Sequence, residues 1–132
     1  MKITVDTNVL VRAAVQDHPG QSAQAVKSLQ EASLVAIPLP VFCEFVWVLR
    51  RGYGISADLI ADAVNRLMSS DNVVMNRPAV EAGLSVLDAG GDFADGVIAY
   101  EGNWAGAEEF VSFDKKAVSI LKSQGNSARL LS

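Results

Sequence analysis

The sequence has almost none of the side chains that build disulfides or zinc sites, because its 132 residues include one cysteine and one histidine. Cys43 alone cannot form an internal disulfide, and its apolar neighbours predict a thiol buried in the core. Structural zinc, which takes four cysteine or histidine ligands, is excluded. His18 stands beside Pro19 and Gly20, which predicts an exposed loop histidine and argues against a Ser-His-Asp triad.

The sequence also lacks long apolar runs and a glycine-rich loop. No run approaches the ~20 residues of a membrane span. Lys2 and Asp6 bracket only three residues and no apolar core of a signal peptide follows, so we expect none. The segment Asp6-Thr7-Asn8 contains no glycine, which excludes a phosphate-binding loop after the first expected strand. Together with the lone cysteine, these absences favour a cytoplasmic protein.

What the sequence does contain is the composition of a compact domain. Half of the residues are hydrophobic and a fifth are charged, and we expect one domain over residues 1–132. The net charge of −4 at first argues against nucleic acid, because domains that bind it are usually basic. Four acidic residues discussed below account for this whole excess, so the bulk charge excludes nothing.

Short apolar segments alternate with longer amphipathic ones along the chain. Caps and breaks at Ser56, Pro78 and Gly90-Gly91 support the boundaries. The alternation predicts a three-layer α/β/α domain with a mostly parallel central sheet of four to five strands. We expect strands over residues 2–6, 34–37, 72–75, 110–113 and 129–131, and helices over 8–15, 21–33, 40–51, 56–69, 78–90, 93–103 and 115–123.

Four acidic residues stand in apolar surroundings. Asp6 and Asp114 each follow an expected strand, Asp95 opens an apolar helical segment, and Glu44 is the only polar residue between Val41 and Leu49. A carboxylate costs several kcal/mol to desolvate without a partner. Ligands of parallel sheets bind at the carboxyl ends of the strands. We therefore expect these acids to share a hard divalent cation, Mg²⁺ or Mn²⁺.

Each acid also has a purely structural interpretation. Asp6 or Thr7 could cap the helix near Asn8, and Asp114 could cap the helix over 115–123. Asp92 and Asp95, three residues apart, resemble a capping arrangement. Glu44 caps nothing and would either pair with Arg51 or reach a metal. One metal site explains all four acids, whereas the structural alternative needs four separate explanations.

Four segments carry a resemblance to a known family, and they occur in the expected order along the whole chain. They are Asp6–Arg12, Pro40–Leu49, Gly91–Ala99 and Phe113–Ala117. The D-T-N alone is unspecific, but together with the helical glutamate, D-F-A-D and F-D-K it is specific. The chain resembles the PIN-domain family, in particular the VapC-type toxins of type II toxin–antitoxin modules.

The resemblance implies an Mg²⁺- or Mn²⁺-dependent endoribonuclease in which metal-bound water attacks an RNA phosphodiester. Its catalytic and metal-binding acids map onto Asp6, Glu44, Asp95 and, less constantly in the family, Asp114. Asn8 would orient Asp6. Gly96 stands where the family often has alanine and is expected to add flexibility beside Asp95. The supporting polar residues expected around the acids are Thr7, Asn8, Asp92 and Ser112, the last in place of a more frequent threonine.

The resemblance also implies partners. VapC-like toxins form homodimers and bind a small VapB-like antitoxin, whose C-terminal segment covers the acidic site with a basic side chain. We expect the antitoxin to contact residues 41–47 and the helices near 21–33 and 56–68.

Three other function classes compete with the ribonuclease. A metal-dependent phosphatase of the haloacid-dehalogenase type wants a second acid where Asn8 stands. A receiver-type switch needs an adjacent acid pair near Asp6, and none is present. A catalytically silent PIN-like scaffold that only binds partners is disfavoured, because all four acids are retained.

Overall fold

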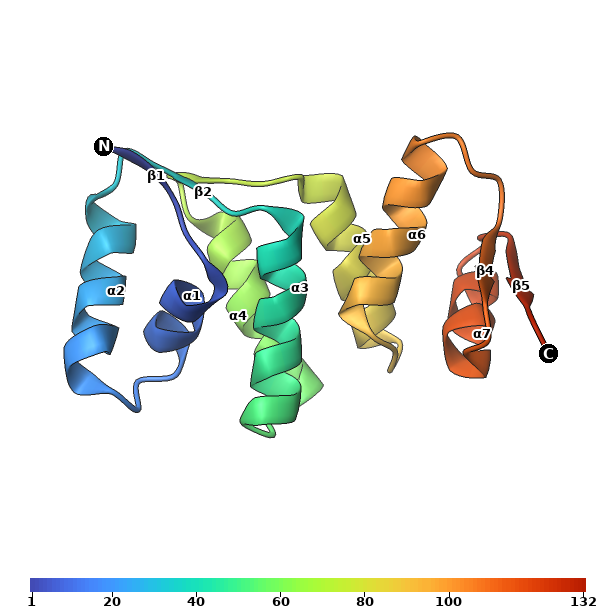
Figure 1. The fold of residues 1–132 in the computed structure, drawn as a ribbon, viewed down its shortest axis with the longest axis horizontal. Helices are drawn as coiled ribbons and strands as arrows, with labels where there is room; N and C mark the ends of the chain where they lie inside the picture. Colours follow the sequence, from blue (N-terminus) through green and yellow to red (C-terminus); the bar gives the residue numbers. More distant parts are fainter. The chain divides into compact units, whose positions relative to one another are not determined.

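The computed structural model describes residues 1–132, which divide into two compact units, Met1–Asn76 and Arg77–Ser132. Figure 1 shows the elements of both, and each unit is described by itself. The first unit contains β1 (Lys2–Thr4), α1 (Thr7–Ala14), α2 (Pro19–Glu31), β2 (Leu34–Ala36), α3 (Leu39–Trp47), η1 (Val48–Gly52), α4 (Ala57–Ser69) and β3 (Val73–Val74). The second contains α5 (Arg77–Asp88), α6 (Phe93–Trp104), β4 (Phe110–Ser112), α7 (Lys115–Ser123) and β5 (Ala128–Leu130).

The first unit is built on a parallel sheet with strand order β1-β2-β3. Ile3 pairs with Val35, and Val35 pairs with Val73 across the central strand. Parallel neighbours require crossover connections, which α1 with α2 and α3 with α4 provide. The fully buried side chains of this unit include Leu10, Val35, Ile37, Phe42, Ile60 and Val64.

Helix α3 carries an apolar stripe that the sequence predicts correctly. Phe42, Phe45, Val46 and Leu49 recur at helical spacing and are all buried. The helix was expected to run unbroken to about Arg51, but its last turn widens into the π-helical segment η1. A π-helical turn is rare and leaves little trace in the spacing of apolar residues, so sequence periodicity misses it.

The second unit pairs β4 with β5 in parallel, and α7 is their crossover. Val118, Ile120 and Leu121 of α7 form a buried cluster with Val86 of α5 and Ala128 of β5. The unit therefore buries the apolar face of α7 against both a helix and a strand, and leaves the lysines of α7 exposed.

Helices α5 and α6 approach each other closely because glycines lie at their crossing. A Cβ atom on Gly96 would overlap the carbonyl oxygen of Ala82, and one on Gly83 would lie 2.7 Å from the ring of Phe93. Gly96 is itself buried. The glycine beside Asp95 thus permits tight helix packing, which corrects the expectation that it adds local flexibility.

The predicted α/β class with parallel strands is confirmed, and the five strands occur as a sheet of three and a pair. Most boundaries agree within two residues. Four of the five strands are shorter than expected, and β5 has the expected length. Helix α2 starts at Pro19, where a break was expected, because proline fits the first turn of a helix. No helix has both the length and the apolar character needed to cross a membrane.

Two expectations about single side chains also change. Cys43 is half-buried and not a core thiol. His18 is exposed as predicted, but it caps α2, since its Nδ1 accepts a hydrogen bond from the backbone N–H of Gln21 at 3.2 Å.

Candidate active site

Asp6 lies just after β1 and caps α1. Its Oδ1 accepts a hydrogen bond from the backbone N–H of Val9 at 3.3 Å, so the capping interpretation is correct for this residue. The carboxylate is exposed, and its other oxygen has no partner in the protein. Thr7 and Asn8 begin α1, and neither side chain hydrogen-bonds to Asp6. Capping therefore orients the carboxylate and still leaves an oxygen for a ligand.

Glu44 lies in the middle of α3 on the face opposite the apolar stripe. Its side chain is exposed, whereas its neighbour Phe45 is buried. Arg51 forms no ion pair with it, so the expected alternative of a Glu44–Arg51 pair is wrong. Since solvent surrounds Glu44, it carries no desolvation penalty that a partner must offset. The apolar sequence around Glu44 reflects one buried helix face, and does not by itself imply a metal.

Asp95 is the acid that the fold does place in a strained electrostatic environment. It lies in the first turn of α6, half-buried, and its backbone N–H donates to the carbonyl of Asp92 at 3.1 Å. Burial raises the pKa of Asp95 above its ordinary value, and the negative charges of Asp92 and Asp114 raise it further. In the second unit, Asp92 and Asp114 are therefore near enough to Asp95 for their charges to act on it.

Asp114 is held by its own loop. Its Oδ1 accepts from the backbone N–H groups of Lys116 at 2.9 Å and Ala117 at 3.1 Å, which caps α7. The Oγ of Ser112 accepts from the backbone N–H of Asp114 at 2.9 Å. The hydroxyl expected at position 112 thus fixes the backbone that carries the acid. Asp92 stands at the N-cap of α6 but makes no capping hydrogen bond, so its carboxylate stays available.

No basic side chain neutralises these acids. The ion pairs join Arg12 to Asp17, Arg77 to Glu81 and Arg129 to Glu109, and all of them avoid the predicted site. An acidic cluster of oxygen donors without a cationic partner has the chemistry that Mg²⁺ or Mn²⁺ requires. Asp92, Asp95 and Asp114 have the charge and the oxygen donors that such a cation takes, but they do not form a group that could hold one by themselves.

The fold does not by itself assemble a complete metal site. Asp6 and Glu44 belong to the first unit, and Asp95 and Asp114 belong to the second. Neither unit alone gathers three or more His, Cys, Asp or Glu side chains in a group that could hold a metal ion. A site shared by all four acids stays a prediction.

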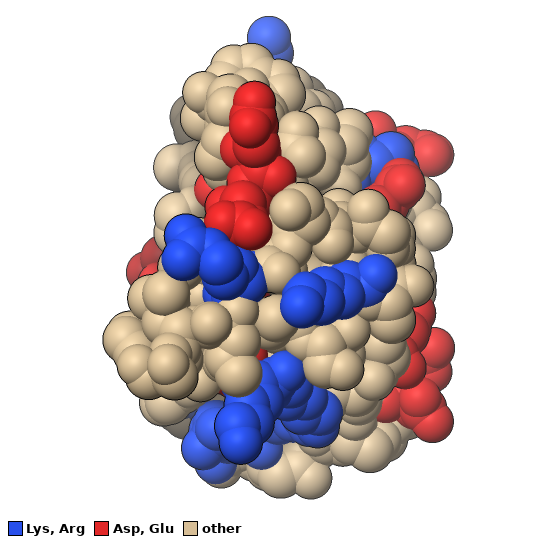
Figure 2. All heavy atoms as spheres, turned by 90° about the vertical axis from the view of Figure 1, so that its right-hand side faces the viewer, with Lys and Arg blue, Asp and Glu red and all other residues tan.

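The lysines of α7 form a basic surface that was not predicted from the sequence. Lys115, Lys116 and Lys122 are exposed, while Val118 and Leu121 on the other face are buried. On the face that carries α7, β4 and β5, Lys and Arg side chains lie in several groups with Asp and Glu beside them (Figure 2). The helical spacing of apolar residues in 115–123 could have identified this basic face, because it fixes which residues point outward.

Comparison with known proteins assigns the chain to a family. A family model described as PIN domain matches residues 3–120, a span that includes all four predicted acids. No curated protein matches the chain. The match covers most of the sequence, and the chain therefore belongs to the PIN domain family.

Proposed function

We propose that this chain is the toxin of a type II toxin–antitoxin module, a VapC-like endoribonuclease that depends on Mg²⁺ or Mn²⁺. The observation that carries the proposal is the PIN domain match over residues 3–120. PIN domains have a nuclease-type fold and are generally metal-dependent nucleases, which makes a hydrolase the function class. The toxin role, the metal and the RNA substrate are proposed beyond that.

The proposed catalytic acids are Asp6, Glu44, Asp95 and Asp114. For Asp95 and Asp114, the electrostatics of the second unit support this role: burial raises the pKa of Asp95, the charges of Asp92 and Asp114 raise it further, and a cation would relieve that repulsion. A bound Mg²⁺ or Mn²⁺ would supply an activated water and neutralise charge on the phosphodiester.

The protein's own contribution is to hold the carboxylates in place. Backbone hydrogen bonds fix one oxygen of Asp6 and one of Asp114, so neither side chain has to be ordered when a ligand arrives. Ser112 fixes the backbone of Asp114 in turn. The exposed lysines of α7 follow directly after Asp114 and are suited to binding RNA phosphates.

The proposed partners are a second copy of the chain and a VapB-like antitoxin with a basic segment. Two exposed apolar side chains support the antitoxin surface expected around residues 41–47 and 56–68. Trp47 at the end of α3 is 60 % exposed, and Leu59 on α4 is 58 % exposed. Trp47→Ala and Leu59→Ala should weaken antitoxin binding, whereas unchanged affinity in both variants would reject this surface.

The test of the proposal uses purified chain and total cellular RNA, with Mg²⁺, with Mn²⁺ and with EDTA. Cleavage is expected only with metal, and Asp6→Asn should abolish it while keeping the cap that Asp6 provides. A chain that binds RNA but never cleaves it would support the silent scaffold instead. A trapped aspartyl-phosphate on Asp6 would support the phosphatase, and full-rate cleavage by Asp6→Asn would refute the assignment of the acids.

A further inference from the structure

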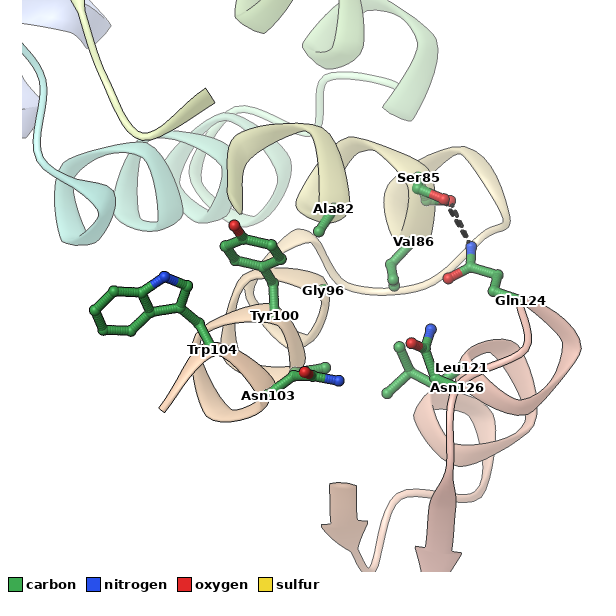
Figure 3. Close-up of a pocket in the computed structure, with 11 residues that line it drawn as sticks. Ala82, Ser85, Val86, Gly96, Tyr100, Asn103, Trp104, Leu121, Gln124 and Asn126 are labelled. Carbon is green, nitrogen blue, oxygen red and sulfur yellow. Dashed lines mark hydrogen bonds between the residues drawn. The ribbon is translucent and has the colours of Figure 1, made fainter. Parts of the chain in front are cut away.

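A pocket in the second unit lies between α6, α5 and the segment after α7, and it contains no charged side chain. Its volume is about 470 Å³, within the range of small-ligand sites. Tyr100 and Trp104 line one end, and the amides of Asn103, Gln124 and Asn126 line the rest together with small and apolar residues (Figure 3). An uncharged pocket with aromatic and amide walls suits a flat, neutral ligand that forms hydrogen bonds.

The aromatic end is open to solvent. Trp104 is the last residue of α6 and is 82 % exposed, which is unusual for the largest apolar side chain. Tyr100 lies four residues earlier, so the two rings are neighbours on one side of the helix. An aromatic face left in water is a ready surface on which a second ring can stack.

The amide end is held in place by local hydrogen bonds. The Nε2 of Gln124 donates to the Oγ of Ser85 at 2.9 Å and to its carbonyl at 3.2 Å (Figure 3). Gly125, with φ +87°, ends α7, and the N–H of Asn126 bonds back to the carbonyl of Leu121 at 3.0 Å. Gln124 therefore keeps its amide oxygen as an acceptor, and Asn126 is set in a fixed position.

Two of the amides have no partner in the protein. The side chains of Asn103 and Asn126 form no internal hydrogen bond, and Asn103 extends from α6 toward Asn126 (Figure 3). Each amide offers both donors and an acceptor, which is the pattern that reads the edge of a nucleobase. Because no lysine or arginine lines the pocket, its ligand is recognised through its base and not through its phosphate.

We propose that this pocket binds unpaired nucleobases of single-stranded RNA, with Trp104 and Tyr100 as stacking faces and Asn103, Gln124 and Asn126 as hydrogen-bonding groups. The inference rests on the proposed function, since it names how the same enzyme selects its substrate. Asp95 and Trp104 are nine residues apart on α6, about 13 Å along the helix axis. The stacking end at Trp104 therefore lies away from Asp95, whereas Gly96, the residue after Asp95, lines the same pocket. The pocket favours single strands because duplex bases are already stacked and paired.

The test measures fluorescence anisotropy of a labelled single-stranded RNA with wild-type chain in EDTA, where no metal-dependent cleavage occurs. Trp104→Leu should raise the Kd about tenfold, the loss expected for one stacked base. Asn126→Ala should raise it about threefold. Tyr53→Leu is the matched control, an exposed aromatic residue of the other unit outside the proposed antitoxin surface, and should leave the Kd unchanged. Since Trp104 is so exposed, its replacement should not disturb folding.

Two further probes identify the ligand as a base. An abasic strand of the same length should bind wild type and Trp104→Leu equally. The dependence of Kd on salt should be unchanged in Trp104→Leu, because no phosphate contact is lost, and should weaken in Lys116→Ala.

Three outcomes would overturn the inference: no RNA binding by the wild type, equal RNA binding by Trp104→Leu, or a dimer that Trp104→Leu converts to a monomer. The last would make a second copy the occupant. Failure of the pocket inference can be distinguished from failure of the proposed function, because cleavage by the wild type with metal tests the acids alone. Cleavage that is indifferent to Trp104 rejects the pocket only, and base binding without any cleavage rejects the nuclease only.

Discussion

The two units treat their acidic residues in opposite ways. In the first unit, Asp6 caps the start of α1, Glu44 lies on α3, and both are exposed to solvent. In the second unit, burial raises the pKa of the Asp95 carboxyl, and the negative charges of Asp92 and Asp114 raise it further. The second unit therefore stores electrostatic repulsion that a cation would relieve, whereas the first supplies exposed carboxylates. If the chain binds a metal ion as proposed, the acids of the second unit should gain more from it than those of the first.

The largest expected effect tests whether the two pairs of acids act together. Asp95→Asn and Asp6→Asn should each lower the cleavage rate at least about 100-fold, because each removes a charge that holds the metal. If all four acids serve one metal, the double variant should be hardly worse than either single variant. Rates measured with saturating Mn²⁺ on a fixed RNA would give this comparison. Multiplicative losses would show that the two units act independently.

The packing of α5 against α6 gives the next largest effect. Gly96→Ala should destabilise the protein by about 1–3 kcal/mol, because the new methyl group overlaps the backbone of Ala82. Gly102 lies on the same helix with nothing near its Cβ position, and Gly102→Ala should stabilise the protein by about 0.5–1 kcal/mol. Urea unfolding of the two variants measures the contrast. Equal stability of both would contradict the proposed role of Gly96 in close helix packing.

Two substitutions of Asp114 distinguish its role as a helix cap from its proposed catalytic role. Asp114→Ala removes two hydrogen bonds to the first turn of α7 and should cost about 1 kcal/mol of stability. Asp114→Asn keeps an oxygen acceptor and should unfold nearly like the wild type, yet should cleave RNA more slowly. Thermal unfolding and cleavage rates of the two variants distinguish the roles. If Asp114→Asn is fully active, Asp114 is a cap and not a ligand.

These contrasts show which features of the fold and the site can be predicted from the sequence. Apolar periodicity predicts the alternating elements, and the motif around Asp6, Glu44, Asp95 and Asp114 predicts the family. The expected cost of desolvating a carboxylate applies only to Asp95, because Asp6, Glu44 and Asp114 are exposed.

Exposure of a charge depends on which helix face meets the core. A run of apolar letters around Glu44 does not reveal that. The sequence does not reveal the role of Gly96 either. Its close contact with Ala82 joins two different helices, and no local sequence pattern predicts such a contact.

The smallest effect concerns the pH dependence of stability in the metal-free protein. Because the pKa of Asp95 is raised on folding, the native state binds more protons than the unfolded chain between the ordinary pKa of 3.8 and the raised pKa. Stability should therefore fall as the pH rises through this window, and Asp95→Asn should remove that loss. At neutral pH the variant should be slightly more stable than the wild type, although it should cleave RNA far more slowly.

Asp92→Asn tests separately whether neighbouring negative charge contributes to the raised pKa of Asp95. Removing the negative charge of Asp92 should lower the pKa of Asp95 toward its ordinary value while leaving the contribution of burial in place. An NMR titration of the Asp95 carboxyl in both proteins would measure the change. An unaltered pKa would mean that burial and the charge of Asp114 set it without Asp92, and the repulsion that distinguishes the second unit from the first would then lack one of its two sources.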